Sequence, residues 1–229
     1  MLDWTPPIVQ VAIDVLTVEA ALPIAEAAAR AGVTWLEVGT PLITFAGTGA
    51  IGAVAREFPH LPVLADYKMM DGVRKYVVEA GAQGASVATV CAVASDASVR
   101  AAVAAGRECG VAVITDLYAA PDVARRARRM EDLGVDSVYV HWGADQRAED
   151  PGRDPLADLP SAVEGATVPV GAGTFSAEDG ARAVELGASI VVIGVPLIQA
   201  SNVEAALREY VERVREAYER RAAGGSELT

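Results

Sequence analysis

The chemistry of this chain is expected around Asp66, Lys68 and Asp71, which bring two carboxylates and one ammonium together in a short segment. Asp66 and Lys68 lie two positions apart, so in an extended strand their side chains point to the same face. At that separation each group favours the charged form of the other. The spacing therefore predicts an ion pair at the end of a strand, where a reacting group can be bound.

Other ionisable side chains stand at the ends of predicted strands in the same way. The whole set comprises Asp14, Glu37, Asp66, Lys68, Asp116 and His141. A charged group at the end of an apolar strand is costly unless it is paired or bound to a metal. An alternative interpretation is a network of ion pairs that only closes the end of the core. Convergence from five different strands favours an active site, because parallel barrels build their sites at that end.

These groups can meet only if their strands run parallel in one closed sheet. Eight apolar runs predict strands at residues 9–13, 35–38, 63–65, 85–87, 111–115, 137–141, 168–170 and 190–193. A helical segment follows each run, and four helices are predicted to end at a glycine just before a strand: Gly32, Gly81, Gly134 and Gly187. Glycine takes the left-handed conformation of a helix C-cap at little cost.

This alternation predicts an α/β fold, a (β/α)₈ TIM barrel near the lower size limit of that fold. An open doubly wound sheet is the alternative, although no GxGxxG follows the first strand to support its dinucleotide-binding form. We expect a single domain over residues 1–220 and a disordered tail over residues 221–229, where no apolar period is present.

Composition narrows the partners and the location. Hydrophobic residues make up 52% of the 229 residues, enough for a sizeable core, and the formal net charge is -12. An acidic chain repels phosphate backbones and anionic membranes, so we expect a small-molecule substrate, no nucleic acid and no membrane partner. Cys91 and Cys109 form no CxxC motif, which argues against a structural zinc site. No signal-peptide pattern or long apolar run is present, so we expect a cytoplasmic protein.

Five segments carry motifs in a recognisable order. They are D-x-K-x-x-D at Asp66-Lys68-Asp71, the second-strand segment at residues 35–43, Asp116-Leu117, His141-Trp142-Gly143-Ala144-Asp145-Gln146, and residues 154–159. In this order they resemble the 3-hexulose-6-phosphate synthase group of the orotidine monophosphate decarboxylase superfamily. The likeness runs from residue 9 to about residue 202 and covers nearly the whole predicted barrel.

The resemblance implies an aldol condensation of formaldehyde with D-ribulose 5-phosphate through an enediolate, with Mg²⁺ (or Mn²⁺) as cofactor. It implies that Glu37 and Asp66 bind the metal, since a hard cation with carboxylate ligands stabilises the charge of an enediolate. It also implies that Lys68 hydrogen-bonds the developing oxyanion. His141 would move protons near neutral pH.

The same resemblance assigns residues to the substrate and to a second subunit. Asp14 and Asp116 would contact the substrate, and Asp71 would reach into the neighbouring subunit's site, which implies a homodimer. A sister group decarboxylates 3-keto-L-gulonate 6-phosphate and tends to carry Glu after strand 5 and Arg three residues beyond the strand-6 histidine. Here those places hold Asp116 and Ala144. They favour the synthase.

The segments expected to bind the substrate's phosphate depart from the family pattern. Backbone N–H groups after strands 7 and 8 bind it in the family, and the corresponding residues here are Gly173, Thr174, Gly194 and Val195. Pro196 has no N–H to donate. Three hypotheses follow: a synthase with a modified phosphate site, an aldolase or decarboxylase acting on a different and even non-phosphorylated substrate, and a non-catalytic barrel that binds a small molecule. The intact acidic and lysine cluster argues against the third.

Overall fold

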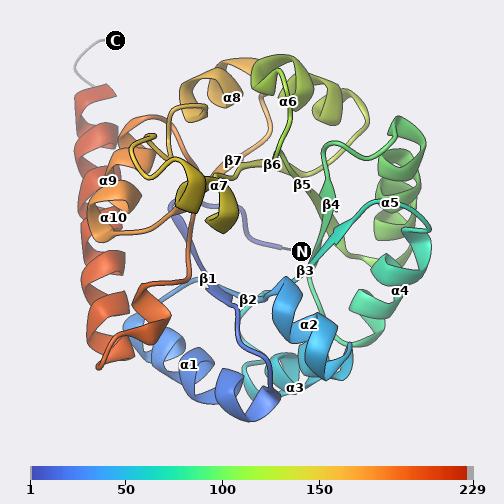
Figure 1. The fold of residues 1–229 in the computed structure, drawn as a ribbon, viewed down its shortest axis with the longest axis horizontal. Helices are drawn as coiled ribbons and strands as arrows, with labels where there is room; N and C mark the ends of the chain where they lie inside the picture. Colours follow the sequence, from blue (N-terminus) through green and yellow to red (C-terminus); the bar gives the residue numbers. More distant parts are fainter. Residues whose placement is uncertain (1, 226–229) are drawn as a thin grey trace.

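The computed structural model describes residues 2–225, and its eight parallel strands close into one barrel (Figure 1). The strands are β1 (Ile8–Ile13), β2 (Trp35–Val38), β3 (Val63–Met69), β4 (Val87–Cys91), β5 (Ala112–Asp116), β6 (Ser137–Val140), β7 (Val170–Thr174) and β8 (Ile190–Ile193). Each strand pairs with the next along the chain, and β1 closes the ring against β8 with Ile8 opposite Ile190. The prediction of a TIM barrel is confirmed.

Helices connect and cover the strands. Within the described residues they are α1 (Val18–Ala31), α2 (Thr40–Ala46), α3 (Gly49–Glu57), α4 (Arg74–Ala82), α5 (Asp96–Cys109), α6 (Val123–Asp132), α7 (Ala144–Glu149), α8 (Leu159–Gly165), α9 (Ala177–Glu185) and α10 (Val203–Gly225), with a 3₁₀ turn η1 (Leu197–Gln199). Figure 1 shows most of them in an outer ring, whereas α7 lies over the barrel opening beside β7. None of these helices is long and apolar enough to cross a membrane.

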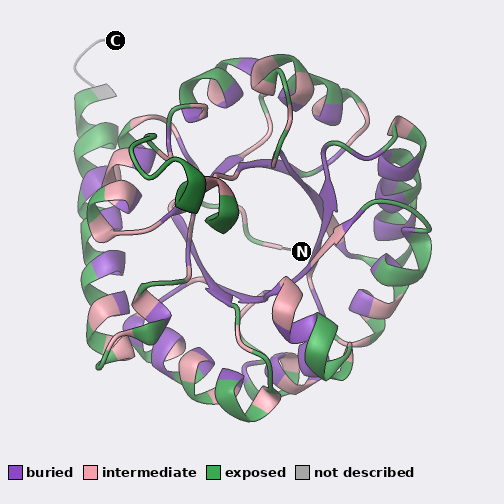
Figure 2. Ribbon diagram, in the orientation of Figure 1, coloured by how far each residue is buried: buried purple, intermediate pink, exposed green. Residues whose placement is uncertain are grey.

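Side chains on each strand alternate between the barrel interior and the helix layer. The lowest interior layer is apolar and consists of Ile8, Trp35, Leu64, Val87, Ile114, Tyr139 and Ile190. Two positions further along their strands come buried polar residues: Gln10, Glu37, Asp66, Thr89 and Asp116. Most of the strand residues appear buried in Figure 2, and together they form the wall of the barrel. The apolar layer therefore closes the floor beneath a polar hollow at the C-terminal ends of the strands.

Three strands extend four residues further towards their C-terminal ends than predicted, and β5 extends one residue further, to Asp116. β3 continues past residue 65 to Met69, β4 covers Val87–Cys91 instead of residues 85–87, and β7 covers Val170–Thr174 instead of residues 168–170. In β7, glycines that are typical of a loop belong to the strand, because a Cβ on Gly171 would lie 2.5 Å from the Tyr139 ring. In β4, an unbroken run of small residues left the start of the strand unmarked.

The helix ends agree with the sequence at three of four glycines. Gly32, Gly134 and Gly187 have φ values of 87°, 89° and 111°. Gly81 instead lies inside α4, and Gly84 takes the left-handed position with φ 91°.

The prediction of a disordered tail from residue 221 is wrong for residues 221–225, which continue α10. Arg221 and Arg220 explain this extension, because their guanidinium groups bond to Val184 O and to Glu185 on α9. Residues 226–229 lie outside the described part of the chain.

Candidate active site

The predicted ionisable residues from five strands meet in one hollow of about 110 Å³ at the C-terminal end of the barrel. Its lining includes Asp14, Glu37, Asp66, Lys68, Asp116 and His141. Four carboxylates thus face one lysine. Such an excess of negative charge in a partly desolvated site favours the binding of a further cation or the protonation of a carboxylate.

Lys68 is brought into the hollow by an irregular segment of β3. The β3–β4 register shifts between Ala65 and Met69, and Lys68 has φ 46°, a left-handed conformation that costs a side-chain-bearing residue free energy. Its backbone N–H donates to Thr89 Oγ1 at 3.0 Å. Backbone strain of this kind is typical of functional positions that the surrounding structure holds in place.

The ammonium of Lys68 pairs with Asp66 and lies 3.9 Å from Asp116 Oδ2. Burial opposes its positive charge, but the carboxylates of Asp66, Glu37 and Asp116 outweigh burial and raise the pKa of Lys68 above its ordinary value. Lys68 is therefore a permanently charged hydrogen-bond donor, suited to stabilise an oxyanion.

Asp66 is a buried carboxylate with three donors. Thr89 Oγ1 donates at 2.6 Å, Thr40 Oγ1 donates at 2.8 Å, and the third donor is Lys68. Burial alone would raise the pKa of Asp66, but Lys68 and these hydrogen bonds lower it, so the group stays ionised. Thr40 and Thr89 did not emerge from the sequence. Thr89 lay beyond the predicted end of strand 4, although a hydroxyl in an otherwise apolar run was visible there.

Glu37 lies at the end of a buried hydrogen-bond chain that the sequence did not reveal. Tyr139 Oη donates to Gln10 Oε1 at 2.7 Å, which leaves the Gln10 amide N–H₂ to donate to Glu37. Burial, followed by the charges of Asp66 and Asp14, raises the pKa of Glu37 well above its ordinary value. The available signal was Gln10 itself, a polar residue in the middle of the apolar strand β1.

Asp116 and His141 form a second pair across the hollow. His141 Nδ1 lies 2.8 Å from Asp116 Oδ2, and Tyr118 N–H donates to the other oxygen of Asp116 at 2.9 Å. A carboxylate on Nδ1 favours the tautomer that leaves Nε2 unprotonated. His141 is thus oriented as a group that can accept and return a proton. Burial and then the charge of Asp66 raise the pKa of Asp14, which completes the lining near β1.

The donor set fits Mg²⁺ or Mn²⁺. Among the described residues no group of three or more His, Cys, Asp or Glu side chains is arranged to hold a metal. Glu37 and Asp66 provide two carboxylates, and Mg²⁺ is commonly bound by one or two carboxylates with water and substrate oxygens completing its shell. Burial and then the nearby carboxylates of Asp66 and Asp14 raise the pKa of Glu37, and a divalent cation held there would favour its ionised form.

Gly173 and Thr174, at the end of β7, face opposite sides of the sheet. Gly173 lines the hollow, but the Thr174 hydroxyl bonds to Val192 O at 2.8 Å and to Tyr210 Oη at 2.7 Å. Thr174 is the next residue of the pleat and faces the helix layer, so its side chain is not available to a substrate. Gly194 comes close to Asp14 at the end of β8, since a Cβ on it would lie 3.8 Å from Asp14 Oδ2. Val195, one residue on, is 41% exposed.

Two residues singled out in the sequence, Asp71 and Cys91, do not line the hollow of this subunit. Asp71 follows β3 and is exposed. Cys91 closes β4 next to the site, and burial raises the pKa of its thiol to about 11. A thiol with such a pKa is a weak nucleophile at neutral pH.

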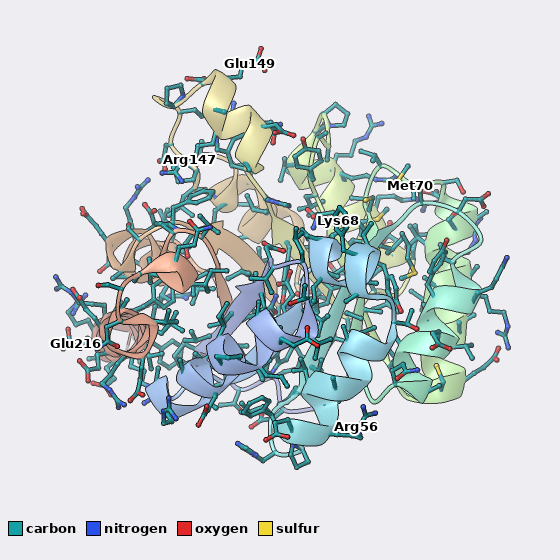
Figure 3. All side chains as sticks on the ribbon, turned by 60° about the horizontal axis from the view of Figure 1, so that its bottom comes forward. Arg56, Lys68, Met70, Arg147, Glu149 and Glu216 are labelled. Carbon is teal, nitrogen blue, oxygen red and sulfur yellow. The ribbon has the colours of Figure 1, made fainter. Side chains whose placement is uncertain are left out.

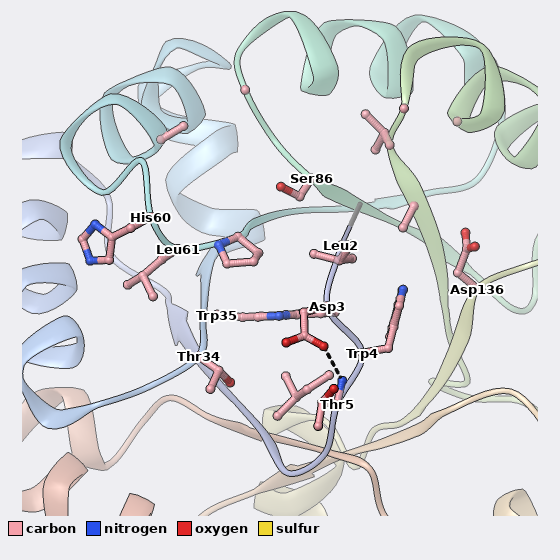
Figure 4. A pocket seen from close by; sticks show the side chains of 18 of the residues that line it. Leu2, Asp3, Trp4, Thr5, Thr34, Trp35, His60, Leu61, Ser86 and Asp136 are labelled. Atoms are coloured by element: carbon pink, nitrogen blue, oxygen red, sulfur yellow. Dashed lines mark hydrogen bonds between the residues drawn. The ribbon is translucent and has the colours of Figure 1, made fainter.

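A larger cavity of about 1380 Å³ lies at the opposite end of the barrel (Figure 4). The N-terminal segment runs through it, and Trp4 packs edge-on against Trp35 with ring centroids 5.2 Å apart. This end of a barrel serves stability, and the carboxylates that flank Lys68 are absent from its described lining. We therefore assign the chemistry to the small polar hollow.

A closed barrel with an acidic and lysine cluster at its C-terminal mouth defines an enzyme of the (β/α)₈ class. The model of the orotidine 5′-phosphate decarboxylase / HUMPS family matches residues 7–210, and the chain belongs to this family. The superfamily resemblance stated from the motifs is confirmed. Like its homologues, the protein is a carbon–carbon lyase, an aldehyde-lyase or carboxy-lyase. The non-catalytic alternative is set aside.

Within this family, the chain is similar to several 3-hexulose-6-phosphate synthases. A 3-hexulose-6-phosphate synthase of Staphylococcus aureus is 33% identical over 201 residues, covering 86% of this chain and 94% of the relative. A crystal structure of 3-hexulose-6-phosphate synthase is 34% identical with a TM-score of 0.84, covering 91% of this chain and 98% of that one. A second, from Salmonella typhimurium, is 28% identical with a TM-score of 0.86, covering 91% and 99%. These similarities support a synthase-like function.

Proposed function

We propose that this protein condenses formaldehyde with D-ribulose 5-phosphate to form a 3-hexulose 6-phosphate, in an Mg²⁺-dependent aldol reaction. The names of the relatives, 3-hexulose-6-phosphate synthases, support the product. The observation that carries the proposal is the ion pair of Lys68 and Asp66 beside Glu37, because it combines a fixed cation with two carboxylates that fit a divalent metal.

The reaction needs a carbanion at C1 of the sugar, stabilised as an enediolate. His141, oriented by Asp116, removes the C1 proton. Lys68 donates a hydrogen bond to the enediolate oxygen on which charge develops. C1 then attacks the carbon of formaldehyde, and His141 returns the proton to the formaldehyde oxygen, which becomes the new hydroxyl. Glu37 and Asp66 would hold Mg²⁺, which would supply additional positive charge to stabilise the enediolate.

The proposal is tested by following the loss of formaldehyde in the presence of D-ribulose 5-phosphate, with Mg²⁺ and then with EDTA. We expect consumption that stops on chelation and a product that retains the phosphate. A decarboxylase of the same family would form a similar enediolate by losing CO₂. Release of CO₂ from 3-keto-L-gulonate 6-phosphate without formaldehyde consumption would therefore reject the synthase in favour of that sister activity.

We further propose that the enzyme is a homodimer. Exposed apolar side chains follow three successive strands: Phe45 after β2, Met70 after β3 and Val93 after β4, with exposed fractions of 70%, 49% and 45%. Asp71 lies among them next to Met70. An apolar edge at the mouth is suited to pack against a second copy, and that contact would carry Asp71 into the partner's site.

A mixing experiment tests the shared site. Asp71→Ala and Lys68→Ala are each expected to be inactive alone, because every site of either homodimer lacks one residue. After subunit exchange, half of the dimers carry one intact site, so activity should recover to about a quarter of the wild-type value. If Asp71 acts within its own subunit, the mixture will be no more active than the separate variants.

A further inference from the structure

The β7–β8 side of the mouth has no cation of its own. No Lys or Arg occurs between Arg153 and Arg182, or between Arg182 and Arg208, a span that includes both strands and the segments following them. Arg182 itself pairs with Asp154. At the end of β7, the Phe175 N–H donates to Asp179 Oδ2 at 3.1 Å. This backbone N–H is therefore not free to bind an anion, and the Asp179 carboxylate adds a negative charge beside it.

Arg147 is brought to this side from elsewhere in the chain. It lies on α7, which follows β6, and its guanidinium carbon stands 4.1 Å from the centroid of the Phe175 ring. Such stacking holds a guanidinium by a cation–π interaction. Among the described residues no carboxylate lies within ion-pair distance of Arg147, whereas Arg153 and Arg182 pair with Asp158 and Asp154.

The position suits the far end of a substrate. In a ring of eight strands, β7 stands opposite β3, which carries Asp66 and Lys68. A chain-like sugar whose reacting end lies at β3 therefore extends across the mouth towards β7. Figure 3 shows Arg147 at the same end of the molecule as Lys68, with Arg56 at the opposite end.

We infer that Arg147, held on the ring of Phe175, binds the anionic end of the substrate and determines the preference for a phosphorylated sugar. This inference rests on the proposed function. A stacked guanidinium keeps its N–H edge free for a bidentate contact with phosphate oxygens. A local cation is needed because the hollow holds four carboxylates and the whole chain carries a net charge of -12.

Arg147→Ala tests the inference, with Arg56→Ala as the matched control that removes an equal charge at the other end of the barrel. We expect KM for D-ribulose 5-phosphate to rise about 10- to 100-fold, the effect of losing a charge-assisted contact. The kcat value should change little, because this contact is made equally in the ground and transition states. Kinetic constants for D-ribulose, which has no phosphate, should not change. Phe175→Leu should raise KM less, and should add nothing to Arg147→Ala.

Isothermal titration calorimetry with D-ribulose 5-phosphate and with inorganic phosphate separates this inference from the proposed reaction. Weaker binding of both ligands by Arg147→Ala, but not by Arg56→Ala, supports the role of Arg147 even if formaldehyde is not consumed. Wild-type affinity in Arg147→Ala overturns the inference. So does a wild-type protein that binds D-ribulose as tightly as D-ribulose 5-phosphate.

Discussion

Replacing Lys68 with alanine is expected to lower kcat at least about 10²- to 10³-fold, the usual effect of removing an oxyanion-stabilising donor. Lys68 carries the one permanent positive charge among the described residues that line the hollow. No other side chain of that lining can replace it. The measurement is kcat for the aldol reaction, with circular dichroism to confirm that the barrel remains folded.

Lys75→Ala is the matched control, since Lys75 is an exposed lysine on α4 and should leave kcat unchanged. Lys68→Gly adds a test of the backbone. Both Lys68 variants should be inactive, but glycine adopts φ 46° without strain, so Lys68→Gly should be more stable than Lys68→Ala by about 1 kcal/mol. Turnover by Lys68→Ala close to the wild-type rate would contradict the mechanism.

Replacing Glu37 with glutamine is expected to weaken Mg²⁺ binding by at least about 10- to 100-fold and to lower activity accordingly. The substitution keeps the shape of the side chain and an oxygen to accept from Gln10, but removes a charge that a metal ligand needs. The melting temperature of the wild-type protein should rise with added Mg²⁺, and that of Glu37→Gln should not. An equal rise in both proteins would place the metal elsewhere.

The same variant should be more stable than the wild type when EDTA is present. The pKa of Glu37 is raised above 4.5 in the folded protein, mainly by burial, so its ionised form destabilises the native state. This destabilisation by ionised Glu37 is absent below pH 4.5 and reaches its full size above the pKa that Glu37 has in the folded protein. The difference in stability between Glu37→Gln and the wild type should therefore grow as pH rises from 4.5 to the folded pKa of Glu37. If Glu37→Gln is less stable than the wild type at pH 8, the ionised Glu37 carboxylate does not destabilise the folded protein.

The barrel and the position of its charged mouth were predictable, because both follow from local patterns. Apolar runs separated by amphipathic helices mark the strands, and the glycines at positions 32, 134 and 187 mark helix ends. Asp66 and Lys68 share a face because of the two-residue period of a strand. The ends of the strands were harder to predict. Gly171 and Gly173 of β7 have the composition of a loop, although the packing of Tyr139 requires a glycine at position 171.

The parts of the site that were missed depend on contacts between strands. The left-handed backbone of Lys68 arises from the register shift against β4, and the orientation of Gln10 is set by Tyr139 from across the barrel. Neither has a local signature. The stacking of Arg147 on Phe175 joins α7 to the segment that follows β7, which are separate in the sequence, so it also needed the three-dimensional structure.

The central claim is that the cluster at the mouth forms an enediolate from D-ribulose 5-phosphate. The most direct test is exchange of the C1 protons with D₂O, followed by NMR in the absence of formaldehyde. We expect the wild-type enzyme with Mg²⁺ to replace a C1 proton with deuterium, and we expect no exchange with EDTA or with Lys68→Ala. Absence of exchange in the folded, Mg²⁺-loaded wild type, or equal exchange in Lys68→Ala, would contradict the assignment of this site.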